Sequence, residues 1–316
     1  MKIGMVFPGY GSQFAGMGKE LYDESRVVQE YFEEAANCLD VNFVKLCFAS
    51  SDVELAQMQN AYTSLLVISG SFAAHLKQEG IVPDVVAGYG IGEYSAIHAA
   101  GGITFPDGLY LLSKYSIFYR QLLDSIKVAG IHVSGITTRK LQKICTEAST
   151  QDSVASIAVQ ETFDRNIVTG HEEAVKRVRD ACSAADGTCK EVPLEAGLHS
   201  ELMAPVVENV KIYLEKVDFK TLSVPLITNA GAKAITKGDA VRTAYIKQIH
   251  SPILWQKSMQ ALHDCDLIIE VGPGSYLTAM LTELYPEKQC VTFNKPADLQ
   301  AIKTIIESNI IQPQEE

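Results

Sequence analysis

The chain has 316 residues, a formal net charge of −11 at pH 7, and a composition that is 47% hydrophobic and 21% charged. Such a length suits one large domain, alone or with a smaller inserted one, and such a composition is ordinary for a soluble globular protein. The acidic balance argues against general affinity for nucleic acid or anionic membranes, because both need a basic protein surface.

The chain opens on a short apolar segment, residues 3–7, which predicts a first strand and is too short for a signal peptide. The longest apolar runs also fall short of a membrane span. Seven cysteines are scattered without paired metal-ligand spacing: Cys38, Cys47, Cys145, Cys182, Cys189, Cys265 and Cys290. We therefore expect reduced thiols, no metal site and a cytoplasmic location.

Strand and helix patterns alternate over residues 1–127. A helical period starts at Phe14 and returns over residues 31–39, and residues 62–78 are apolar nearly all round, as in a buried helix. A short strand over residues 85–87 precedes a glycine-rich turn and a helix over residues 93–100. This alternation predicts a mainly parallel sheet covered by helices.

The pattern changes over residues 128–195. It predicts a strand, a helix, two strands, a helix and a strand, at residues 131–135, 138–148, 154–159, 166–170, 172–184 and 188–192. That βαββαβ order is typical of a ferredoxin-like unit. We therefore expect a small subdomain inserted into an α/β domain made of residues 1–127 and 196–316.

The first pattern resumes after the insertion. It predicts a helix over residues 200–217 and strands over residues 224–229, 267–271 and 291–293. The tail, residues 312–316, is expected to be disordered.

The turn Gly88-Tyr89-Gly90-Ile91-Gly92-Glu93 has the strand-turn-helix setting of a G-x-S-x-G nucleophile elbow, with Gly90 in the place of the serine. Glycine has no side chain that can attack a thioester. The alternative is a phosphate-binding glycine loop, but no acidic residue is placed convincingly to bind a ribose.

Ordered sequence blocks resemble the malonyl-CoA:acyl carrier protein transacylases and the related acyltransferase domains of polyketide synthases. FPGYGSQ (residues 7–13) resembles their F-P-G-Q-G-S-Q opening, and GYGIGEYSA (residues 88–96) resembles their G-H-S-L-G-E-Y-S-A elbow. Further matches in family order are GLHS with Leu202-Met203, PLITN at residues 225–229, Gln248 with Ser251-Pro252 and Trp255, and EVGPG at residues 270–274. The resemblance implies an α/β-hydrolase-like large domain with an inserted ferredoxin-like subdomain.

The resemblance also implies a site. In this family a serine, activated by a histidine, takes an acyl group from coenzyme A and passes it to the phosphopantetheine thiol of an acyl carrier protein. His199 matches that histidine, and Gln248 matches the residue whose main-chain carbonyl orients it. The backbone N–H groups of Tyr10 and Ile91 match the oxyanion-hole donors, which do not depend on side-chain identity.

Three positions in the implied acyl pocket differ from the family pattern. Tyr115 stands where the family has an arginine that pairs with the carboxylate of malonyl, and a phenol cannot supply that charge. AVQETFDR (residues 158–165) replaces the loop A-N-x-N-x-P-G-Q and introduces Glu161, while Leu198 stands where malonyl-type members usually have phenylalanine. Lys114 and Arg165 are the cations that could reach a carboxylate by another route.

Three functions are therefore compared. The first is a family member that has lost serine-dependent malonyl transfer and keeps binding to acyl carrier protein or coenzyme A thioesters. The second is a thioester hydrolase or single-displacement transferase that uses His199 and the backbone oxyanion hole. The third is an ordinary S-malonyltransferase with relocated catalytic residues, although Ser12, Ser95 and Ser200 are ordinary accompanying residues in the family pattern. No cofactor is implied beyond a coenzyme A thioester as ligand, and the family-based expectation is a monomer.

Overall fold

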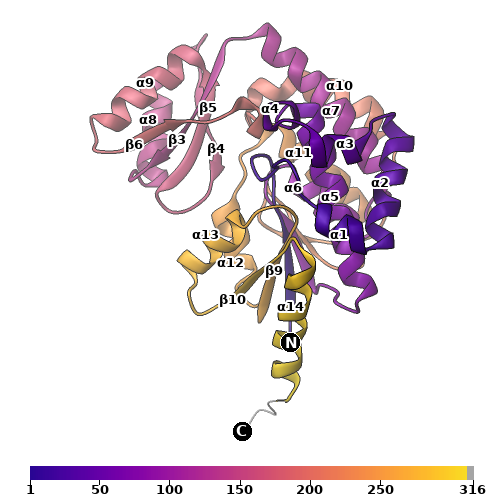
Figure 1. Cartoon of the computed structure of the whole chain (residues 1–316). Helices are drawn as coiled ribbons and strands as arrows, with labels where there is room; N and C mark the ends of the chain where they lie inside the picture. Colours follow the sequence, from indigo (N-terminus) through magenta and orange to yellow (C-terminus); the bar gives the residue numbers. More distant parts are fainter. Residues whose placement is uncertain (312–316) are drawn as a thin grey trace.

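Two β-sheets organise the chain in a computed structural model that describes residues 1–311 (Figure 1). The larger sheet has the order β10-β9-β1-β2-β7-β8, in which the first five strands are parallel and β8 runs antiparallel at the edge. Its strands are β1 (Ile3–Phe7), β2 (Val85–Gly88), β7 (Leu226–Ile227), β8 (Ala234–Ile235), β9 (Leu267–Val271) and β10 (Gln289–Phe293). The predicted parallel sheet is thus confirmed, with one antiparallel edge strand that the sequence pattern did not predict. The predicted disordered tail, residues 312–316, lies outside the described residues.

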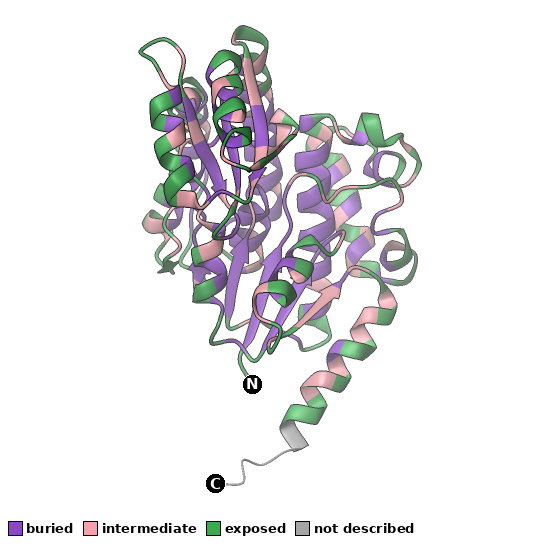
Figure 2. Ribbon diagram, turned by 90° about the vertical axis from the view of Figure 1, so that its left-hand side faces the viewer, coloured by how far each residue is buried: buried purple, intermediate pink, exposed green. Residues whose placement is uncertain are grey.

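Helices cover both faces of this sheet, so β1, β2 and β9 are buried along their whole length (Figure 2). Met5 and Phe7 of β1 join the core on one face, whereas Val6 between them joins the core on the other. The first face is covered by α1 (Lys19–Glu24), α2 (Arg26–Leu39), α3 (Phe43–Ala49), α4 (Asp52–Leu55), α5 (Met58–Gln78), α6 (Gly92–Ala99), α7 (Phe105–Ser125), α10 (Ala204–Leu214), α11 (Gly238–His250) and α14 (Pro296–Ile311). The second is covered by α12 (Trp255–Ala261) and α13 (Tyr276–Leu284).

The smaller sheet is antiparallel, with the order β4-β5-β3-β6. Its elements are β3 (Val128–Ser134), α8 (Thr138–Ala148), β4 (Ala155–Gln160), β5 (Arg165–His171), α9 (Glu172–Ser183) and β6 (Thr188–Glu191). The amphipathic helices α8 and α9 bury Leu141 and Val178 against this sheet. The ferredoxin-like prediction is confirmed; the limits of the inserted unit, residues 128–195, stay a prediction.

The small sheet is joined to the large domain through β4. The Gln160 N–H donates to the carbonyl of Ile253 at 2.8 Å, and the Ile253 N–H donates to the carbonyl of Ala158 at 2.9 Å. Ala158 and Val159 also share a core with Ile253 and Trp255 of the large domain. The loop that follows β4 is therefore held beside the ends of the parallel strands.

Helix α7 was not predicted from the sequence, and it carries Tyr115. Thr104 caps its first turn by accepting a hydrogen bond from the Asp107 N–H at 3.2 Å, and Pro106 lies in that turn. The predicted helix over residues 200–217 is shorter, because a 3₁₀ turn over Glu201–Met203 precedes α10. No helix within residues 1–311 is long and apolar enough to cross a membrane.

Candidate functional site

The turn between β2 and α6 places Gly90 in the left-handed region, with φ of 56°. A Cβ on Gly88 would lie 2.1 Å from the nitrogen of Glu93, and a Cβ on Gly92 would lie 2.2 Å from the oxygen of Phe7. A Cβ on Gly90 would meet nothing closer than the Ile253 Cδ1 atom, at 3.6 Å. Two glycines of the turn are thus required by close backbone approach, whereas the third has space for a side chain at the cost of some backbone strain.

The carbonyl of Gly90 is held by two side-chain amides. It accepts hydrogen bonds from Gln248 Nε2 and from Asn229 Nδ2, the latter at 2.9 Å. The Asn229 N–H in turn donates to Glu93 Oε2 at 2.5 Å. Burial raises the pKa of the Glu93 carboxyl to about 8, although the Asn229 N–H opposes that rise. Glu93 is therefore largely protonated at neutral pH.

His199 lies within the same hydrogen-bonded group. Its Nδ1 atom is 2.8 Å from the main-chain oxygen of Gln248, so Nδ1 carries the proton and donates it to that carbonyl. Burial lowers the pKa of His199, although the same carbonyl opposes that shift, so the imidazole is neutral at pH 7. Its Nε2 atom is buried and has no hydrogen-bond partner among residues 1–311. This is the tautomer that a general base needs.

The two predicted oxyanion donors are the N–H of Ile91, in the turn, and the N–H of Tyr10, in the loop after β1. Within the described part of the chain, neither the Tyr10 N–H nor the Ile91 N–H donates a hydrogen bond. The Ile91 N–H belongs to the same planar peptide group as the Gly90 carbonyl, so the amides that hold this carbonyl also fix the direction of the N–H. Gln248 therefore orients both His199 and one of the two predicted oxyanion donors.

Tyr115 lies in a cluster of buried aromatic rings, 1% exposed. Its ring centroid is 5.7 Å from that of Tyr62, 6.3 Å from that of Tyr94 and 5.9 Å from that of Tyr119; we call these four residues the tyrosine cluster. Burial raises the pKa of Tyr115 well above its ordinary value, so its phenol is neutral. Leu198 is also buried and joins the same core.

Hydrogen bonds tie the tyrosine cluster to the segment before His199. The Tyr62 hydroxyl donates to the carbonyl of Glu195 at 2.6 Å, and the Tyr119 hydroxyl donates to the carbonyl of Leu194 at 2.5 Å. The position that the family resemblance assigns to an arginine is thus part of a closed aromatic packing.

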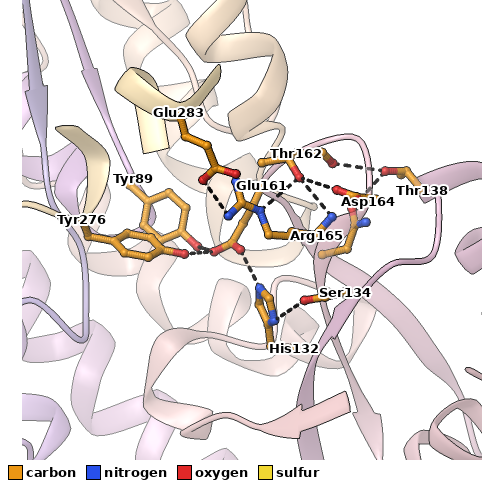
Figure 3. Close-up of polar contacts among 11 residues, drawn as sticks. Tyr89, His132, Ser134, Thr138, Glu161, Thr162, Asp164, Arg165, Tyr276 and Glu283 are labelled. Carbon is orange, nitrogen blue, oxygen red and sulfur yellow. Dashed lines mark hydrogen bonds and ion pairs between the residues drawn. The ribbon is translucent and has the colours of Figure 1, made fainter. Parts of the chain in front are cut away.

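Glu161 accepts hydrogen bonds from both parts of the molecule (Figure 3). Its Oε1 atom accepts from the hydroxyl of Tyr89 at 2.5 Å and from that of Tyr276 at 2.9 Å, and its Oε2 atom is 2.9 Å from Nε2 of His132. Burial opposes ionisation of Glu161, but the hydrogen bonds from His132 and the two tyrosines outweigh burial and lower its pKa. The buried carboxyl is therefore ionised.

A cavity of about 380 Å³ lies beside the turn, between the large domain and the small sheet. Its lining includes Tyr10, Tyr89, His132, Glu161, Ala196 and Tyr276. Of the predicted site residues, Tyr10 and Glu161 line this cavity, whereas Tyr115 and Leu198 lie in the packed core. A larger cavity, of about 520 Å³, is lined mainly by residues of α5 and α6 and of the loops that precede β2 and β7, and by none of the predicted site residues.

The two cations considered from the sequence are engaged elsewhere. Arg165 Nη1 lies 2.9 Å from Glu283 Oε2 on α13. The Nζ atom of Lys114 lies 5.5 Å from the ring centroids of Tyr110 and Tyr213. Neither residue lines the cavity beside the turn.

Sequence analysis missed His132 and Tyr276. They lie on β3 and at the start of α13, far from Glu161 in the chain, and no local pattern marks either one. Only the pairing of the small sheet and the packing of α13 bring them to the carboxylate. Within residues 1–311, no group of three or more His, Cys, Asp or Glu side chains could hold a metal ion.

Comparisons with known proteins agree with this architecture. The family model for the acyl transferase domain matches residues 5–298. The malonyl CoA-acyl carrier protein transacylase of Bacillus subtilis (strain 168) is 30% identical over 313 residues, which are 98% of each chain.

Two solved structures of similar proteins share the fold of this chain. An acyl carrier protein S-malonyltransferase from Vibrio cholerae O1 biovar eltor str. N16961 matches with a TM-score of 0.91 at 27% identity, covering 96% of this chain and all of that one. A malonyl-transacylase in complex with its holo type II PKS acyl-carrier protein matches with a TM-score of 0.91 at 26% identity, covering 95% and 98% of the two chains. With the ordered sequence blocks and the two-sheet fold, these matches show that the chain belongs to the acyl transferase domain family that includes the malonyl-CoA:acyl carrier protein transacylases.

Proposed function

We propose that this chain binds an acyl carrier protein and acyl thioesters but does not carry out serine-dependent malonyl transfer. The observation that carries the proposal is Gly90, a residue without a nucleophile at the tip of a turn whose other parts are in place. Removal of a triad nucleophile typically lowers turnover on the order of 10⁶-fold. Transfer by the usual two-step route should therefore be negligible.

The binding part of the proposal rests on the relatives and on the cavity. One solved relative is held in a complex with an acyl-carrier protein, and it aligns with 95% of this chain. The cavity reaches Tyr10, whose N–H has no partner within residues 1–311, and it reaches Tyr89 next to Gly90. These features support a site that receives the thioester end of a carrier arm.

A second candidate is hydrolysis or single-displacement transfer, in which His199 activates water or a carrier thiol. The neutral imidazole and its unpartnered Nε2 atom favour this candidate. The burial of His199, which is 1% exposed, works against access of water. The third candidate, a malonyltransferase with relocated catalytic residues, has less support. Ser12 is one of the serines that would have to replace the nucleophile, and its hydroxyl already donates to the carbonyl of Gly9 at 2.7 Å.

Covalent labelling tests the proposal. The unaltered protein, incubated with radiolabelled malonyl-CoA or acetyl-CoA, should retain no label after denaturation. Gly90→Ser should gain label from acetyl-CoA, because the site has room for a Cβ at residue 90 and His199 is already oriented. Gly90→Ala is the matched control, because it brings the same backbone strain without a hydroxyl. Label on the unaltered protein would contradict the proposal and favour the ordinary transferase.

Two further measurements separate the remaining candidates. Calorimetric titration with holo acyl carrier protein should show saturable binding, and the proposal fails if neither the carrier protein nor any coenzyme A thioester binds. Thioester hydrolysis by the unaltered protein that is lost in His199→Ala would establish the second candidate instead of a binding role alone.

A further inference from the structure

The Glu161 carboxylate stands beside the elbow and inside the cavity. It is 2% exposed, and it accepts a hydrogen bond from Tyr89, the residue directly before Gly90. Tyr276 and His132 contact the same carboxylate from α13 and from β3. The hydrogen bonds lower the pKa of Glu161, so the inner wall of the cavity carries a fixed negative charge.

The cavity offers little positive charge in return. Within residues 1–311, His132 is the only basic side chain that contacts Glu161. Arg165 is paired with Glu283 outside the cavity. The neighbouring residues Lys190 and Glu191 of β6 also line the cavity, but both are exposed and contribute one charge of each sign.

A thioester whose carbonyl oxygen accepts from the Tyr10 and Ile91 N–H groups can direct its acyl group in two ways. Toward the cavity, the acyl group approaches the Glu161 carboxylate. Toward the core lies the tyrosine cluster, whose Tyr62 ring centroid is 6.2 Å from that of Tyr10 and whose phenols are neutral because burial raises their pKa. Within residues 1–311, the basic side chains that line the cavity are His132, which contacts Glu161, and Lys190, which is exposed on β6 beside Glu191. A carboxylate that is removed from water next to Glu161 without a counter-charge of its own is strongly disfavoured.

We propose that Glu161 is a specificity-determining residue that restricts this site to acyl groups without a carboxylate, such as short uncharged acyl chains. The inference rests on the proposed function, because it assigns a ligand class to the same thioester site. It predicts that malonyl and other dicarboxylic acyl groups are rejected through charge rather than through shape.

Three coenzyme A thioesters of similar acyl size separate charge from shape in the unaltered protein: malonyl-CoA, propionyl-CoA and the neutral amide analogue of malonyl-CoA. Measured by calorimetry, propionyl-CoA and the amide analogue should each bind at least about tenfold more tightly than malonyl-CoA, because two like charges in a low-dielectric site repel strongly. Glu161→Gln, which keeps the shape and removes the charge, should raise the affinity for malonyl-CoA about tenfold and leave that for propionyl-CoA unchanged. Glu208→Gln is the matched control, because Glu208 is an exposed residue of α10 outside the cavity.

The outcomes distinguish the two proposals. Equal affinity for malonyl-CoA and propionyl-CoA overturns the role of Glu161 and leaves the proposed function standing. If the amide analogue binds as weakly as malonyl-CoA, the site selects by shape, and the role of Glu161 is overturned as well. Absence of binding by all three thioesters overturns this inference, and the proposed function falls with it only if holo acyl carrier protein does not bind either. The measurements on the unaltered protein decide the question even if Glu161→Gln does not fold.

Discussion

The elbow and the cavity wall beside it meet at Tyr89, but they are held together in different ways. In the elbow, each of the contacts that fix the geometry has a main-chain partner: the glycines approach other backbone atoms, two side-chain amides hold the Gly90 carbonyl, and a main-chain oxygen holds the His199 imidazole. The wall is made of side chains from separate segments, with Tyr89, His132, Glu161 and Tyr276 among its polar members. The frame of the site therefore does not depend on the side chain of residue 90, whereas the ligand selection that we propose depends on side chains of the wall.

The largest expected effect comes from a substitution that disturbs the backbone contacts of the elbow. Gly88→Ala places a Cβ 2.1 Å from the nitrogen of Glu93, where only backbone movement can make space. We expect a loss of more than about 4 kcal/mol in the free energy of unfolding, or failure to fold. Denaturant unfolding monitored by circular dichroism measures this loss.

Gly90→Ala is the matched comparison for that prediction. Its Cβ meets its nearest neighbour at 3.6 Å, so only the positive φ opposes it, at about 1–2 kcal/mol. Equal destabilisation by the two variants would show that residue 90 has no more room for a Cβ atom than residue 88 has.

The second effect concerns the buried carboxyl that supports the elbow. The pKa of Glu93 is raised to about 8 from an ordinary value of 4.5, so its contribution to stability is fully present below pH 4.5 and is lost as the pH rises to 8. Glu93→Gln keeps the neutral shape and has no such titration. The free energy of unfolding of the variant, minus that of the unaltered protein, should increase with pH by about 1.4 kcal/mol per unit between these values.

Chemical denaturation at a series of pH values between 5 and 9 measures this difference. Other buried groups titrate in both proteins and cancel in the subtraction. A difference that stays constant over this range would mean that Glu93 is ionised in the folded protein.

The smallest effect belongs to the cavity wall. Tyr89→Phe removes a hydrogen bond to an ionised, buried carboxylate and should lower the free energy of unfolding by about 1.5–3 kcal/mol. Tyr276→Phe removes the other hydrogen bond to the same oxygen, but Tyr276 is 49% exposed, so its loss should be about 0.5–1 kcal/mol. Thermal unfolding shows which of the two variants is less stable. If Tyr276→Phe is the less stable one, the stronger hydrogen bond to Glu161 comes from α13.

Much of the fold follows from local patterns in the sequence. Residues 3–7 and 267–271 are short and mainly apolar, which favours buried strands, and the βαββαβ order of the small sheet follows from its alternating periods. The positions of Gly90 and His199 followed from ordered sequence blocks. The structure adds that Gln248 links the two, through its side-chain amide and its main-chain oxygen.

Other parts could not be predicted because they depend on tertiary contacts. The cavity wall gains His132 and Tyr276 only through strand pairing and the packing of α13. Tyr115 was expected in a ligand pocket, but the structure places it among buried rings, since its neighbours come from α5, α6 and α7. The short edge strand β8 has only two residues and carries too little pattern to be recognised.

The two hydrogen bonds of Gln248 bear on which side chains residue 90 can carry. The Gln248 side-chain amide bonds the main-chain carbonyl of residue 90, and the Gln248 main-chain oxygen bonds the His199 imidazole, so neither contact requires a particular side chain at residue 90. Residue 90 is a position at which serine or cysteine can be introduced as a chemical probe of an otherwise assembled site.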